Sequence, residues 1–207
     1  MNHPTRRDVL RFAGSAAAAA AISPSLAFAL ADRKIPIALE LYSVRNELAK
    51  DFVPTIQAVG KMGYQAVEFA GYYGWDKKPQ ELRKLLDDNG LKCCGTHTAL
   101  QTLEGDNLAR TIELHKILGN KFLICPSLGA KDAQGWMNLA KQFNDIAAKC
   151  KEQDMFVGYH SHAGDYKKFD GKTSWEIFFD NTNPEVIHQR HYVKILAAPL
   201  MLREPVT

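Results

Sequence analysis

The chain has 207 residues, of which 46% are hydrophobic and 24% are charged, a composition typical of globular proteins. Its formal net charge is only +3, and its basic residues are scattered apart from short pairs such as Lys77-Lys78 and Lys167-Lys168. These figures argue against nucleic acid as a partner, because surfaces that bind it need clustered basic side chains.

The first segment of the chain has the three parts of an export signal. An arginine pair at positions 6–7 precedes an alanine-rich apolar stretch, and Ala-Phe-Ala at 27–29 resembles a cleavage site. An arginine pair before hydrophobic residues is typical of the twin-arginine signal. We therefore expect a signal peptide at 1–29 and a periplasmic or exported protein. The alternative is a membrane anchor, but Pro24 and the short apolar run argue against stable membrane insertion.

Strand-like and helix-like stretches alternate after this segment. Short apolar runs bounded by turn residues predict strands, and apolar residues at helical spacing predict helices. The predicted strands cover residues 36–44, 64–71, 91–97, 121–129 and 155–162. The predicted helices cover residues 51–63, 78–90, 106–120, 132–154 and 174–182. The alternation predicts parallel βαβ units.

Two α/β architectures fit such units, a doubly wound sheet and a (β/α)8 TIM barrel. A doubly wound sheet usually carries a glycine-rich phosphate loop after its first strand, whereas this chain continues as LYSVRNEL. Titratable side chains instead recur where predicted strands end, at Glu68, His97, His160 and His162. A TIM barrel builds its active site from such strand ends, so we expect this fold.

Cys93, Cys94, Cys125 and Cys150 form no C-x-x-C motif. Adjacent cysteines seldom pair, because disulfide geometry is restrictive. We expect buried, reduced thiols and no disulfide or zinc framework.

Five segments in this order resemble the sugar phosphate isomerase/epimerase group of the xylose-isomerase-like TIM barrels. They are LELYSVRNEL, GYQAVEFAGYYG, LRKLLDDNGLKCCGTHTAL, LGNKFLICPSL and GYHSHAGDYKKFDGKTSWEIFFDNT. The combination of VEFAG, GTH and YH-x-H is the most specific part of the resemblance. It implies a small-molecule sugar as substrate and an isomerase or epimerase that moves a proton next to a sugar carbonyl. It also implies a divalent metal cofactor, which would be Mn, Mg, Co or Zn.

The resemblance gives His160 the place of a metal ligand. The family usually takes four ligands from strands five to eight, and His160 stands where the strand-five glutamate usually lies. The alternative for His160 is a hydrogen-bonded histidine at a strand end. The branch that this chain resembles often has YHNH followed after two residues by Glu, whereas here Ser161 replaces Asn and Asp165 takes the acidic position.

Two carboxylates are candidates for acid/base catalysis. Glu68 points to the barrel mouth if Val67 and Phe69 face the helices, and a salt bridge is its alternative role. Asp165 follows the fifth strand, and capping of a loop is its alternative role. Either group could move a proton next to a carbonyl.

Three further side chains are candidates for substrate binding. They are His97, whose alternative is a buried structural role, His162, which shares a strand face with His160, and Tyr72. Tyr72 follows the second strand, and its alternative role is packing. His115 falls within a predicted helix, and we expect it at the surface.

The resemblance ends in the sixth unit. The family would continue with a D-x-G-like strand and later an H-x-K-D-like strand, but the segment 190–207 contains no Asp and no Gly. We expect an incomplete barrel of five to six βα units at 30–189, followed by a tail that is frameshifted or divergent. An open barrel leaves unpaired strand edges, which favour aggregation or closure by a second copy, that is, a homo-oligomer.

Three functions therefore stay open. The first is the metal-assisted isomerase or epimerase, whose activity is in question because three of its four expected metal ligands are missing. The second is a lyase or hydrolase of oxidised (keto) glycosides, since one barrel hosts many reactions. The third is a non-catalytic, truncated remnant.

Overall fold

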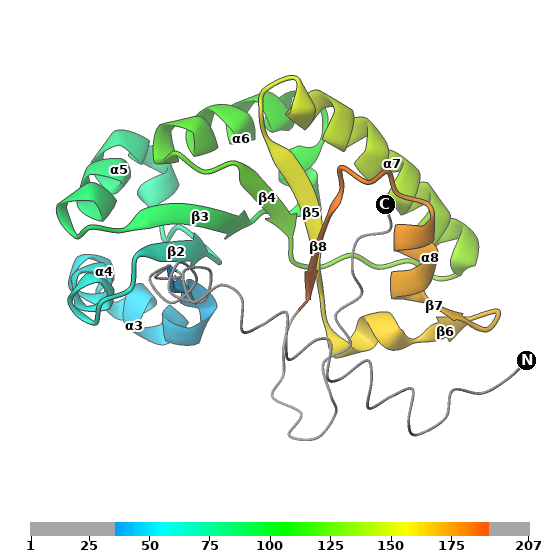
Figure 1. Ribbon diagram of the computed structural model, residues 1–207, viewed down its shortest axis with the longest axis horizontal. Helices are drawn as coiled ribbons and strands as arrows, with labels where there is room; N and C mark the ends of the chain where they lie inside the picture. The colour runs from blue at the N-terminus through cyan, green and yellow to red at the C-terminus, as the bar shows by residue number, and fades with distance from the viewer. Residues whose placement is uncertain (1–35, 191–207) are drawn as a thin grey trace, which may run out of the picture. The chain divides into compact units, whose positions relative to one another are not determined.

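A computed structural model describes residues 36–190 (Figure 1). The expected signal peptide at 1–29 lies outside the described residues, and so does the expected tail at 190–207 apart from Arg190, which ends the last described strand.

Six parallel strands form one sheet in the order β1-β2-β3-β4-β5-β8. They are β1 (Ala38–Glu40), β2 (Ala66–Phe69), β3 (Lys92–His97), β4 (Phe122–Cys125), β5 (Phe156–Ser161) and β8 (Ile187–Arg190). The helices between them are α3 (Arg45–Lys50), α4 (Phe52–Lys61), α5 (Pro79–Asp88), α6 (Gly105–Leu118), α7 (Ala133–Lys151) and α8 (Ser174–Asp180). A hairpin of β6 (Lys168–Phe169) and β7 (Lys172–Thr173) precedes α8. This arrangement confirms an α/β fold of the TIM-barrel type, incomplete in its described part.

The first strand is shorter than the expected 36–44. The chain leaves the sheet after Glu40 and forms a 3-10 helix over Leu41–Val44. The Glu40 carboxylate caps this helix by accepting a hydrogen bond from the backbone N–H of Tyr42 at 2.9 Å. The turn brings Glu40 and Tyr42 to the same end of the sheet as the other strand ends.

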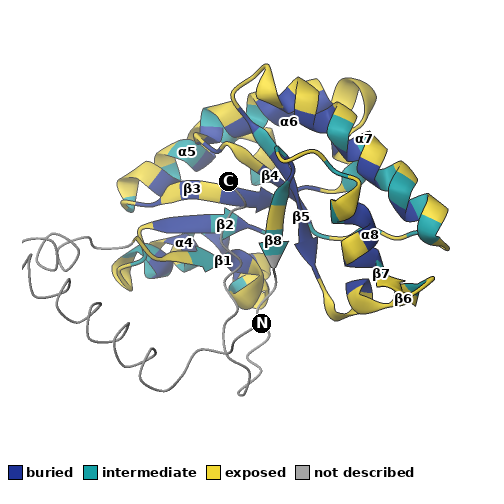
Figure 2. Cartoon of the chain, turned by 45° about the vertical axis from the view of Figure 1, so that its right-hand side comes forward, coloured by how far each residue is buried: buried dark blue, intermediate teal, exposed yellow. Residues whose placement is uncertain are grey.

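Helices cover one face of the sheet, and buried residues line the strands beneath them (Figures 1 and 2). The apolar side chains form two clusters, one around β2 and β3 and the other around β4 and β5. In β2, Val67 and Phe69 are fully buried in the first cluster, so the alternation of the strand turns Glu68 to the opposite face. Val67 and Phe69 thus face the helices, as the expectation for Glu68 required, whereas its place at the barrel mouth stays a prediction.

Three of the four cysteines match the expectation of buried thiols. Cys93, Cys125 and Cys150 are buried, whereas Cys94 is exposed, and all four are free. Burial raises the pKa of Cys93 to about 12 and the pKa of Cys125 and of Cys150 to about 11. The three buried thiols are therefore protonated and unreactive near neutral pH.

Among the helices of residues 36–190, none has the length and apolar character needed to cross a membrane. Within this part of the chain β1 and β8 are the two edges of the six-stranded sheet. The expectation of a homo-oligomer stays a prediction that sedimentation would test.

Candidate functional site

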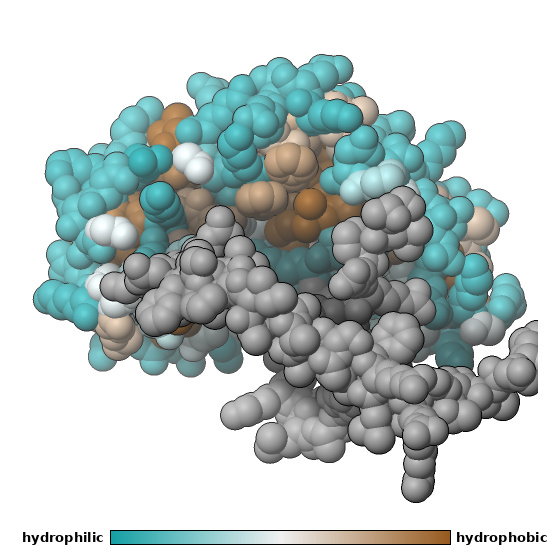
Figure 3. Space-filling model, viewed as in Figure 1, coloured by the Kyte–Doolittle hydropathy of each residue, from teal (hydrophilic) through white to brown (hydrophobic). Residues whose placement is uncertain are grey.

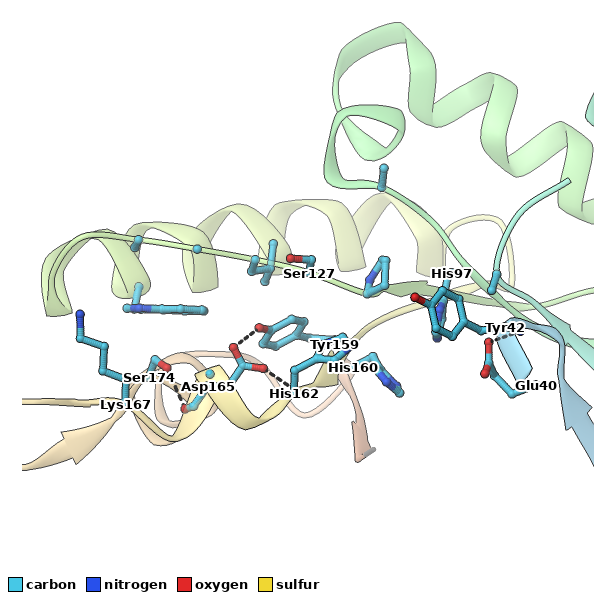
Figure 4. Close-up of a pocket in the computed structure, with 18 of the residues that line it drawn as sticks. Glu40, Tyr42, His97, Ser127, Tyr159, His160, His162, Asp165, Lys167 and Ser174 are labelled. Carbon is cyan, nitrogen blue, oxygen red and sulfur yellow. Dashed lines mark hydrogen bonds between the residues drawn. The ribbon is translucent and has the colours of Figure 1, made fainter. Parts of the chain in front are cut away.

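A pocket of about 890 Å³ lies at the C-terminal ends of the strands (Figure 4). It is lined by residues that follow or end β1, β3, β4 and β5, among them Glu40, Tyr42, His97, Ser127, His160, His162, Asp165 and Lys167. Hydrophobic side chains also gather near the middle of one face of the molecule, within a largely hydrophilic surface (Figure 3). The pocket stands where the sequence predicts an active-site mouth.

The register of the sheet explains which side chains share its inner face. Parallel register partners point the same way, and the structure pairs Glu40 with Glu68 and His160 with Gln189. Glu40 was not among the predicted site residues, although it is a titratable residue at the end of a strand, like the residues that were predicted. Its signal was hidden because the first strand was expected to continue for four more residues.

A hydrogen-bonded bridge joins Glu68, Gln189 and His160. The amide Nε2 of Gln189 donates to Oε1 of Glu68 at 2.8 Å, and the amide Oε1 of Gln189 lies 2.8 Å from Nδ1 of His160. The alternative role of Glu68 was a salt bridge, but no ion pair among residues 36–190 includes it. Its hydrogen-bond partner is the amide of Gln189 instead. Glu68 therefore stands beside the pocket lining rather than within it.

Three imidazole rings stand in a row on the pocket wall. The ring centroids of His97 and His160 are 4.8 Å apart, and those of His160 and His162 are 4.9 Å apart. Nε2 of His97 is buried and has no hydrogen-bond partner in the described part of the chain. The structure thus brings together all three histidines that the sequence singled out at strand ends.

Asp165 is buried and holds the turn that follows β5 (Figure 4). Its carboxylate accepts a hydrogen bond from the Tyr159 hydroxyl at 2.6 Å and one from the backbone N–H of His162 at 2.7 Å. Its backbone carbonyl accepts a third from Ser174 Oγ at 2.7 Å. Burial, together with the Asp165 carboxylate, raises the pKa of Tyr159 well above its usual range. These contacts favour the loop-capping role of Asp165 over proton transfer.

Tyr72 does not line the pocket. Its ring stacks on Phe69 with centroids 4.9 Å apart, and its hydroxyl lies 2.9 Å from Thr96 Oγ1 and 2.8 Å from Nε2 of His115. These contacts favour the packing role that the sequence left open for Tyr72.

His115 is buried, with 2% of its surface exposed, so the expectation that it lies at the surface is wrong. Its Nδ1 donates to the carbonyl of Thr111 at 2.6 Å, which leaves Nε2 to accept from the Tyr72 hydroxyl at 2.8 Å. Helical periodicity alone did not reveal this because the partner lies 43 positions away in the chain.

The buried imidazole predicts a pH dependence of stability. Burial lowers the pKa of His115 in the folded protein. Above about pH 6.5 both folded and unfolded chains hold a neutral ring, and below it only the unfolded chain gains the proton, so stability falls as pH falls, by up to about 1.4 kcal/mol per pH unit. Urea unfolding between pH 7.5 and 5.5 should show a shallower loss in His115→Gln than in the wild type. Equal slopes would contradict this prediction.

The described residues do not by themselves form the expected metal site. Among residues 36–190, no group of three or more His, Cys, Asp or Glu side chains is placed to hold one ion. Gln189 separates His160 from Glu68, and it stands on β8, the strand from which the resemblance implied an aspartate. The role of His160 as a metal ligand therefore stays a prediction.

The sequence model of the family described as "Xylose isomerase-like TIM barrel" matches residues 56–186. The chain belongs to this family. No curated protein matches the sequence.

Solved structures give the same fold. A sugar phosphate isomerase/epimerase from Parabacteroides distasonis is 22% identical with a TM-score of 0.64, and the match covers 75% of this chain and 64% of that one. An AP endonuclease, family 2, from Brucella melitensis is 15% identical with a TM-score of 0.57, covering 75% and 68%. A xylose isomerase-like TIM barrel protein from Mycobacterium smegmatis, in complex with magnesium, is 14% identical with a TM-score of 0.52, covering 75% and 62%. At these identities the likeness concerns the fold, and this chain spans 64% of the length of the first structure.

Proposed function

We propose that the pocket binds a sugar or sugar phosphate and moves a proton at the carbon next to its carbonyl group. The observation that carries this proposal is the row of His97, His160 and His162 on the pocket wall, with the Glu68–Gln189 bridge behind His160. Imidazole is the side chain best suited to exchange protons near neutral pH. Membership of the xylose isomerase-like family supports a sugar as the substrate.

In the proposed reaction His160 takes a proton from the carbon next to the carbonyl and returns one to that carbon or its neighbour. The buried Nε2 of His97, which has no partner among residues 36–190, would hydrogen-bond to a substrate oxygen. Tyr42 is 56% exposed and lines the pocket; the guanidinium of Arg45 lies over one face of its ring, 4.4 Å from the centroid, and the other face is the one proposed for a sugar. Lys167, also on the pocket wall, supplies a positive charge that suits a phosphate group.

Solvent exchange tests the proposal. The full chain would be incubated in D2O with aldoses, ketoses, sugar phosphates and 3-keto-glycosides, with and without Mn²⁺, Mg²⁺, Co²⁺ or Zn²⁺, and followed by NMR. We expect deuterium at the carbon next to the carbonyl of at least one sugar. Release of the aglycone from a keto-glycoside would instead support the lyase or hydrolase, and sugar binding without exchange would support a non-catalytic role.

Gly95 provides a mutation that tests the placement of Glu68. A Cβ at Gly95 would lie 2.8 Å from Oε1 of Glu68, so Gly95→Ala forces that carboxylate away from Gln189. Because Glu68 is the end of a flexible side chain, we expect the fold to persist while proton exchange falls about 10- to 100-fold. Deuterium incorporation and urea unfolding would be measured together.

The matched control is Gly71→Ala, whose new Cβ would meet no atom closer than 3.9 Å. Gly71 lies two residues after the end of β2, and its substitution should leave exchange unchanged. An active Gly95→Ala protein would show that the position of Glu68 does not matter.

We also propose that residues 1–29 direct export and are removed. The arginine pair at positions 6–7 and the Ala-Phe-Ala at 27–29 support this proposal. Mass spectrometry of the protein recovered from the periplasm should find Leu30 at its N-terminus. Recovery of the full-length chain in the cytoplasm alone would contradict export.

A further inference from the structure

The side chain of Gln189 connects β8 with β2, which are not neighbours in the sheet. Gln189 lies on β8, in register with His160 on β5, yet its side chain also reaches Glu68 on β2. His160 lies on β5, which is next to β8, whereas Glu68 lies on β2, near the other edge of the sheet. The bridge therefore spans the inner face of the sheet. Glutamine is suited to this place because its amide has one donating end and one accepting end.

The direction of the hydrogen bonds along this bridge is fixed by Glu68. A carboxylate oxygen only accepts, so the NH2 end of the Gln189 amide must face Glu68, at 2.8 Å. The carbonyl end then faces His160, where it too can only accept, at 2.8 Å from Nδ1. Nδ1 of His160 must therefore carry a proton, and in the neutral ring Nε2 is the atom with the lone pair.

We propose that Gln189 is a positioning residue that holds His160 as the Nδ1–H tautomer, with Glu68 as the anchor of the amide. The tautomer is inferred from the two hydrogen bonds of the Gln189 amide, and only its consequence for turnover rests on the proposed function. In that function Nε2 is the atom that takes the substrate proton. An imidazole with its proton on Nε2 would have no lone pair there.

The tautomer can be read directly in the full chain by long-range ¹H–¹⁵N NMR of ¹⁵N-histidine protein at pH 8, where an ordinary imidazole is neutral. The signals of His160 are those that disappear in His160→Gln. We expect the wild type to show the Nδ1–H tautomer. A dominant Nε2–H tautomer in the wild type would overturn the proposal without any variant.

Two variants test whether the hydrogen bonds of the Gln189 amide, rather than the size of its side chain, set the tautomer of His160. Gln189→Leu removes the acceptor at a similar size, so His160 should shift towards the Nε2–H tautomer. The double variant Glu68→Gln with Gln189→Glu exchanges the two groups, so it keeps an acceptor for Nδ1–H and a donor opposite that acceptor, and it should retain the wild-type tautomer. Gln57→Leu, an exposed glutamine on α4, is the matched control and should change nothing.

Circular dichroism melting would establish that each variant is folded. If Gln189→Leu does not fold, the wild type and the double variant still decide the matter, because a dominant Nε2–H tautomer in either one overturns the proposal. In Gln189→Leu we also expect kcat for proton exchange to fall about 10- to 100-fold with little change in KM. A wild type with the Nδ1–H tautomer and no exchange on any sugar would refute the proposed function and leave the tautomer assignment standing.

Discussion

Replacing His160 with glutamine is expected to lower the rate of deuterium exchange into a sugar substrate by about 100-fold or more. His160 lines the pocket and, in the proposed function, is the group that transfers the proton, a role that contributes 10²- to 10⁴-fold in enzymes. Glutamine has a similar size and can hydrogen-bond, but it does not exchange protons near neutral pH. The rate would be measured by NMR under saturating sugar.

A matched control lies on the opposite face of the neighbouring strand. His188 is exposed and stacks on Phe179 with ring centroids 3.6 Å apart, away from the pocket lining. The His188→Gln protein should keep its exchange rate once the amount of folded protein is normalised. Equal loss in both variants would show that the effect is not specific to the pocket histidine, and full activity of His160→Gln would remove His160 from the proposed reaction.

Replacing Phe178 with alanine is expected to reduce the free energy of unfolding by about 3–5 kcal/mol. Phe178 lies on α8, has no exposed surface and packs against Phe143 and Tyr159 with ring centroids 5.1 and 5.3 Å away. Truncation therefore removes contacts between α8, α7 and β5 and leaves a cavity at their centre. Urea denaturation monitored by circular dichroism would measure the loss.

Phe122→Ala serves as the comparison for the same change of residue type. Phe122 is 37% exposed and stacks on Phe156 with centroids 5.5 Å apart, so part of its ring already contacts water. Its removal should cost less than about 2 kcal/mol. A loss of less than about 2 kcal/mol in Phe178→Ala as well would mean that α8 is not part of the cooperative core.

Much of the fold could be predicted because its signals are local. The alternation of Val67, Glu68 and Phe69 indicates which face of β2 is buried. The same two-residue period predicts that His160 and His162 lie on one side of their strand. Apolar spacing in the helices likewise predicts their inner faces. These patterns act over a few residues, so they can be read without knowing the rest of the chain.

The site itself was predicted less completely. His97 and His160 lie together as expected of strand ends, whereas Tyr72 lies under the helices with His115. The sequence leaves open whether Asp165 transfers protons or caps a loop. Its hydrogen bonds with Tyr159 and His162 favour the capping role. Residue type and spacing do not state which hydrogen bonds a buried group makes.

The sequence by itself determined the class of fold and the strand ends at which polar groups collect, because periodicity and turn residues are local properties of the chain. The family followed from the resemblance of its segments and from the family model that matches residues 56–186. The tertiary structure decided which of these groups meet. Gln189 reaches Glu68 across 121 positions of sequence because the sheet carries β2 and β8 to facing positions. Sheet curvature, strand order and register are collective properties of all six strands, so the bridge that orients His160 exists only once they are assembled.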